Sequence, residues 1–153
     1  MTVLPIRFLR LGVAAISLAG VSLHGQSAEE QSAHLAVRLQ ARNVGAASAR
    51  VELRIRVAPG WHIGDREPGD TGLPTRITWI LPEGWRVTKE TWPTPTVQTD
   101  RNGTARTHAG EVTVISEISR SQKRSGKIEA TVKAGVCRDV CIPEAVRLSA
   151  VVR

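Results

Sequence analysis

From residue 33 onward, hydrophobic and polar side chains alternate with a period of two over several short stretches. The clearest stretch is RVELRIRV, residues 50–57, in which four aliphatic side chains alternate with four charged ones. Because successive side chains of a β-strand point to opposite faces of the sheet, this pattern predicts a strand with one buried and one solvated face. The same pattern predicts seven strands in all, over residues 33–40, 50–58, 76–81, 85–91, 111–118, 127–134 and 146–152.

Glycine and proline stand between most of these stretches, and no stretch after residue 27 has the period of an amphipathic helix. Seven short strands separated by turn signals predict an all-β fold, an immunoglobulin-like antiparallel β-sandwich. Two connections, residues 59–75 and 93–110, are too long for hairpin turns, and long ordered loops often carry function. For residues 98–109, a merely flexible loop is an equally good expectation.

The N-terminal segment, residues 1–27, has the pattern of a cleavable export signal. Two arginines within the first ten residues precede an apolar stretch of 13 residues, 11–23. A transmembrane helix needs about 20 apolar residues, so a signal peptide is favoured over a membrane anchor. Small residues near the end of the segment favour cleavage after Ser27, with cleavage after Ala28 as the alternative. We therefore expect one periplasmic domain over residues 28–153, with no membrane span in the mature chain.

The basic charge of the chain does not indicate a nucleic-acid partner. The formal net charge is +7, but in residues 50–57 the arginines form the solvated face of a strand and not a phosphate-binding patch. Hydrolytic chemistry has no support either, because the sequence contains neither a G-x-S-x-G nor an H-E-x-x-H motif.

The two cysteines, Cys137 and Cys141, are spaced C-x3-C. In an extended strand, residues four apart are about 13 Å apart, whereas a disulfide needs Cα atoms within about 7 Å. A bond therefore requires residues 138–140 to form a turn between two strands, and an exported pair is expected to oxidise. Closing a five-residue loop stabilises a fold by only about 2 kcal/mol, against nearly 5 for a hundred residues. The short loop favours a redox disulfide over a structural one, and a local structural clamp is the alternative.

A metal site is a third interpretation of the two cysteines. Cys137, Cys141, His62 and His108 have the donor atoms of a Cys2His2 site, but the two histidines lie on separate predicted loops. The sequence also lacks a methionine cluster for copper(I), because Met1 is its only methionine. We therefore expect no metal.

The segments PGWHIGDREPGDTGLPTRITWILPEGWRVTKETWPTP and GVCRDVCIPE together resemble the N-terminal periplasmic domain of the thiol:disulfide interchange protein DsbD. The likeness is greatest to the branch found in the copper-sensitivity suppressor proteins, and it extends over about residues 50–150. The resemblance implies an immunoglobulin-like sandwich that serves as a component of a protein-disulfide reductase. By the match of motifs, Cys137 and Cys141 are the catalytic redox pair, with Cys141 as the exchanging sulfur and Cys137 as the resolving one.

The resemblance also implies the partners. The chemistry is thiolate attack through a mixed disulfide, with no cofactor. Electrons are expected from a thioredoxin-like or membrane-embedded disulfide reductase, and oxidised periplasmic proteins are expected to receive them. Full-length relatives continue into a membrane domain and a thioredoxin-like domain, so a chain ending at Arg153 is expected to use a separate reductase. The alternative is a non-catalytic binding or adaptor domain with a local structural disulfide.

In the family, a loop that often carries aromatic residues caps the disulfide and moves aside for partners. Residues 93–110 match the position of this loop, but they contain no aromatic residue. The resemblance therefore makes Trp61, His62 and Trp92 the candidates for shielding the disulfide.

Overall fold

A computed structural model describes residues 27–121 and 124–153, which form eleven strands. The predicted signal peptide lies outside the described residues except for Ser27, the first residue of β1. Among the described residues, no helix is long and apolar enough to cross a membrane.

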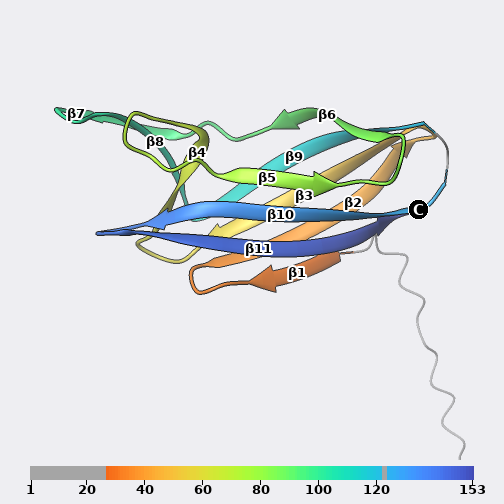
Figure 1. Ribbon diagram of the computed structural model, residues 1–153, viewed down its shortest axis with the longest axis horizontal. Coiled ribbons are helices and arrows are strands. Elements are labelled where there is room, and N and C mark those ends of the chain that lie inside the picture. Colours follow the sequence, from red (N-terminus) through yellow and green to blue (C-terminus); the bar gives the residue numbers. More distant parts are fainter. Residues whose placement is uncertain (1–26, 122–123) are drawn as a thin grey trace, which may run out of the picture.

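The strands form two antiparallel sheets that make an immunoglobulin-like sandwich, which confirms the predicted fold class (Figure 1). The first sheet has the order β1 (Ser27–Gln31), β2 (Leu35–Gly45), β3 (Ser48–Val57), β9 (Glu111–Arg120) and β6 (Trp85–Thr91). The second has the order β11 (Cys141–Val152), β10 (Gly126–Cys137), β4 (His62–Gly69), β8 (Gly103–Ala109) and β7 (Thr96–Asp100), and β5 (Arg76–Ile80) also pairs with β10.

The core lies between the two sheets and is built by the alternation that the sequence shows. On β3, Val51, Leu53 and Ile55 are completely buried, while the charged side chains between them are half-buried or exposed. On β10, Ile128, Ala130, Val132 and Val136 supply the facing surface from the second sheet and are also completely buried. Each large aliphatic side chain buried in this way stabilises the fold by about 1.5–3 kcal/mol.

Four strands were not predicted, and two expected loops are wrong in detail. Residues 59–75 contain β4, and residues 93–110 contain the hairpin of β7 and β8. The flexible loop considered for residues 98–109 is therefore also wrong. The strands of this hairpin have few apolar side chains, and every residue of β7 is exposed. The hairpin is ordered by backbone pairing with β4, which a pattern of hydrophobic residues does not reveal.

The connection from β4 to β5, residues 70–75, passes close to two glycines, Gly64 and Gly135. A Cβ atom on Gly64 would lie 2.0 Å from the carbonyl oxygen of Leu73, and one on Gly135 would lie 2.7 Å from the Leu73 side chain. Leu73 thus packs against β10 two residues before Cys137. A glycine at position 64 is required because the atom it approaches belongs to the backbone and cannot rotate away.

We expect Gly64→Ala to lower the free energy of unfolding by about 2–3 kcal/mol, because the added methyl group overlaps the Leu73 carbonyl. Gly45→Ala is the control, since a Cβ there meets only the hydroxyl of Ser48, 2.8 Å away at the end of a flexible side chain. Its cost should stay below about 1 kcal/mol. Urea unfolding of the two variants measures the difference. An equal loss of unfolding free energy in both would contradict the close approach of this connection to Gly64.

Candidate functional site

The two cysteines close the hairpin of β10 and β11. The strands pair in register from Gly126 opposite Val152 to Cys137 opposite Cys141, the last pair before the turn. The Cα atoms of the cysteines are 4.0 Å apart, and their sulfurs form a disulfide. Within the turn, the backbone N–H of Arg138 donates to the carbonyl of Val140 over 3.1 Å. The turn predicted for residues 138–140 is confirmed.

The two sulfur-bearing residues differ in exposure. Cys137 is 7% exposed and is flanked on both sides, by Cys141 on β11 and by His62 on β4. Cys141 is exposed, because β11 is at the edge of its sheet. Its neighbours Val140 and Ile142 are apolar and 64% and 37% exposed. Cys141 is therefore the more accessible of the two cysteines, and exposed apolar side chains lie beside it.

Two of the three candidate shielding residues lie at this turn. His62 is paired directly with Cys137 across the β4–β10 ladder. Trp61 is half-buried, and the guanidinium carbon of Arg138 lies 5.0 Å from the centroid of its indole ring. An arginine over an aromatic face at this range is a cation–π contact. Trp61 also contacts His34, whose ring centroid is 4.0 Å from that of the indole.

A buried carboxylate that the sequence analysis missed joins this group. Glu144 accepts hydrogen bonds from the Ser32 hydroxyl and, at 3.1 Å, from the His34 backbone N–H. It also pairs with His34 Nδ1 at 2.5 Å. Burial alone would raise the pKa of Glu144, but these hydrogen bonds and the charge of His34 outweigh it, so the pKa lies below its ordinary value. The burial of this residue could have been predicted, because Glu144 occupies an inward position in the alternation of β11.

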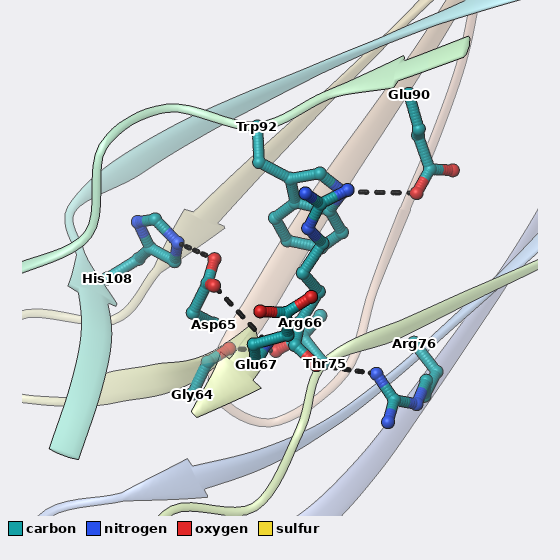
Figure 2. A network of polar contacts seen from close by, with 9 residues as sticks. All are labelled: Gly64, Asp65, Arg66, Glu67, Thr75, Arg76, Glu90, Trp92 and His108. Carbon is teal, nitrogen blue, oxygen red and sulfur yellow. Dashed lines mark hydrogen bonds and ion pairs between the residues drawn. The ribbon is translucent and has the colours of Figure 1, made fainter. Parts of the chain in front are cut away.

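The third candidate, Trp92, makes its contacts in a different network, drawn in Figure 2. Its indole N–H donates to Glu90 over 3.0 Å, and its ring centroid is 6.2 Å from that of His108. His108 Nε2 in turn lies 2.8 Å from a carboxylate oxygen of Asp65, and both residues are buried. The shielding of the disulfide by Trp92 stays a prediction.

The pair of Asp65 and His108 ties β4 to β8. Burial would raise the pKa of Asp65, but the hydrogen bond with His108 and the backbone N–H groups of Glu67 and Arg66 lower it below its ordinary value. His108 is thus engaged by a carboxylate, while His62 is beside Cys137. Within the part of the chain that the structure describes, no three histidine, cysteine, aspartate or glutamate side chains are grouped to hold a metal ion.

The β7–β8 hairpin borders the site. An open groove runs between the turn that carries Trp61 and His62 and the hairpin, with Thr96, Gln98 and Thr107 on the hairpin side. In Figure 1 this hairpin and the tip of β10 and β11 extend toward the same end of the molecule. The segment that matches the family's cap in position is thus a neighbour of Trp61 and His62.

Residues 29–153 match the family model of the N-terminal domain of the thiol:disulfide interchange protein DsbD. The chain belongs to this family. The family prediction made from the sequence motifs is therefore confirmed. A search of curated proteins found no match.

Solved structures of other proteins are similar to this fold. The N-terminal periplasmic domain of ScsB from Proteus mirabilis aligns with a TM-score of 0.63 at 22% identity, covering 82% of this chain and 51% of that one. This chain thus spans about half the length of the ScsB domain. The GAE domain of GGA2p from Saccharomyces cerevisiae aligns with a TM-score of 0.52 at 11% identity, covering 81% and 96%. The reduced DsbD N-terminal domain of Neisseria meningitidis aligns with a TM-score of 0.47 at 16% identity, covering 72% and 82%.

The lowered pKa values of Asp65 and Glu144 predict a loss of stability in acid. Their ordinary values are 3.8 and 4.5, and both carboxyls titrate lower in the folded chain. The unfolded chain therefore takes up protons first as the pH falls, so the stabilisation is complete above about pH 5 and is lost through the lowered folded values. Urea unfolding between pH 6 and pH 3 should show this fall.

Asp65→Asn and Glu144→Gln should each flatten the dependence of the unfolding free energy on pH, since each removes one titrating group. Glu83→Gln, which changes an exposed carboxylate, is the control and should leave the slope as in the wild type. A slope unchanged in all three variants would contradict the assignment of these two carboxylates.

Proposed function

We propose that the chain is a periplasmic thiol–disulfide exchange module that passes reducing equivalents through Cys137 and Cys141. The observation that carries the proposal is the asymmetry of the pair: in a chain of the DsbD N-terminal family, an exposed Cys141 faces a buried Cys137 at the tip of an edge hairpin. An exchange reaction needs one accessible sulfur to attack a partner and a second sulfur within reach to resolve the product.

The reaction of the reduced protein has two balanced steps. First, the Cys141 thiolate attacks one sulfur of a partner disulfide; a bond forms between Cys141 and that sulfur, and the partner's other sulfur leaves as a thiolate and takes up a proton. Second, the Cys137 thiolate attacks the Cys141 sulfur, which forms the intramolecular disulfide and releases the second partner thiolate. Two electrons have then passed to the partner, and no cofactor is needed.

The oxidised protein is returned to the dithiol form by the same chemistry in reverse. The electron donor in this proposal is a separate thioredoxin-like or membrane-embedded disulfide reductase, and the acceptors are oxidised periplasmic proteins. The apolar side chains of Val140 and Ile142 beside Cys141 support a protein partner, because exposed apolar groups next to a reactive atom are covered when a protein docks. The predicted signal peptide, residues 1–27, supports the periplasmic location.

The reduction potential separates exchange from a structural clamp. We expect the Cys137–Cys141 couple to have a potential of roughly −180 to −270 mV, the range of exchange catalysts. Equilibration with glutathione or dithiothreitol buffers, followed by alkylation and mass analysis, measures it. A potential well below about −300 mV is typical of structural disulfides and would support the non-catalytic adaptor domain instead.

The roles of the two sulfurs are tested by trapping. Cys137→Ser leaves the exposed Cys141 without a resolving thiol, so a mixed disulfide with an oxidised thioredoxin-like protein should accumulate and be visible on a non-reducing gel. Cys141→Ser leaves only the buried thiol and should trap at least about tenfold less. Trapping mainly by Cys141→Ser would reverse the assignment, and the double variant shows the background.

A further inference from the structure

Four side chains form a ring of contacts that begins and ends on the cysteine hairpin. Glu144 follows Cys141 by three residues on β11 and pairs with His34. The His34 ring lies against Trp61 in a tilted arrangement, and the guanidinium of Arg138, the residue after Cys137, lies over the Trp61 ring. We propose that this ring is a positioning device that holds the turn 138–140 in place when the disulfide is reduced, and so sets the redox equilibrium of the pair. This inference rests on the exchange function proposed above.

The fixed end of the ring is Glu144. Its side chain is only 5% exposed, and both of its carboxylate oxygens are occupied, one by His34 Nδ1 and the other by Ser32 and the His34 backbone N–H. Hydrogen bonds to a charged group are stronger than those between neutral groups. The His34 ring is therefore held against β11 in one orientation.

The middle of the ring is Trp61, which the turn before β4 brings to the hairpin. Its side chain packs against the core, and its ring lies against His34 at an interplanar angle of 38°. These contacts leave the indole few alternative rotamers. The Arg138 guanidinium rests on this ring and also bonds the exposed Asp139 over 3.2 Å.

The last part of the ring is the turn that contains Arg138, residues 138–140. Apart from the disulfide, three contacts between described residues hold residues 138–140: the 3.1 Å backbone hydrogen bond from Arg138 to Val140, the bond of Arg138 with Asp139, and the contact of Arg138 with Trp61, which reaches outside the turn. Reduction removes the covalent closure, and the sulfurs then stay close only as far as these contacts keep the turn folded. A held turn raises the effective concentration of one thiol near the other, which favours the disulfide at equilibrium.

Removing the ring should therefore make the pair easier to reduce. We expect Trp61→Ala to lower the equilibrium constant for disulfide formation against glutathione by three- to tenfold, which raises the reduction potential by roughly 15–30 mV at about 30 mV per tenfold. Trp61→Phe keeps a flat ring for both contacts and should stay within twofold of the wild type. A change in global stability that affects both redox forms equally leaves the potential unmoved, so the potential reports positioning.

Arg138→Gln tests the ring at an exposed residue where folding is not at risk. Losing the contact with Trp61 should raise the potential, whereas losing a cation beside a thiolate should lower it. We expect the first effect to be the larger, so that Arg138→Gln raises the potential by no more than Trp61→Ala does. The double variant should show no further rise, because both changes break the contact between Arg138 and Trp61. Arg147→Gln removes a charge from β11, the strand that follows the turn, without changing the contact with Trp61, and should stay within twofold of the wild type.

The proposal is overturned if Trp61→Ala stays within twofold of the wild type, if Arg138→Gln lowers the potential, or if the two changes add. These differences between variants are separate from the absolute potential of the wild type. A wild-type potential well below the range of exchange catalysts contradicts the exchange function. Unchanged variants with a wild-type potential inside that range contradict only the ring.

Discussion

The ladder between β10 and β11 is the constraint on which the rest of the structure depends. Twelve residue pairs continue without a register shift from the end of the chain to the cysteines. Side chains of a strand alternate between faces, so a slip of one residue would turn every core side chain of these strands to solvent. The buried Ile128, Val132 and Leu148 therefore fix the register, and the register places Cys137 opposite Cys141.

The position of the ladder in its sheet then makes the two sulfurs unequal. β10 has neighbours on both sides, and β11 forms the edge of its sheet. Cys137 is covered by β4 and His62, while Cys141 remains open to solvent. A symmetric pair of thiols would not define which sulfur attacks and which resolves. In the proposed exchange reaction, the order of strands in the sheet would supply that difference.

Two buried carboxylates hold the surroundings of the hairpin. Taking a carboxylate out of water is costly unless hydrogen bonds replace the water that it loses. Glu144 receives them from Ser32 and His34, and Asp65 receives them from His108 and the backbone of residues 66 and 67. Each carboxylate therefore joins two separate parts of the chain: Glu144 joins β11 to the β1–β2 turn, and Asp65 joins β4 to β8.

The sequence predicted those parts of the fold that bury a regular apolar face. The strands β3, β9, β10 and β11 alternate clearly and were found, and the close spacing of the cysteines required the turn between them. Strands β7 and β8 were missed because polar strands that pair at a sheet edge have no hydrophobic pattern. The contacts of Glu144 were out of reach because its partners are 110 and 112 residues away in the chain. Only the fold brings such groups together.

The reactivity of the two thiols tests the central claim, that Cys141 is the exchanging sulfur, most directly. Arg138 lies between the cysteines, so trypsin separates them into two peptides after brief alkylation of the reduced, folded protein with iodoacetamide. We expect Cys141 to be modified at least about tenfold faster than Cys137, because a thiol reacts in proportion to its access and its thiolate content. Equal rates, or faster modification of Cys137, would contradict the account.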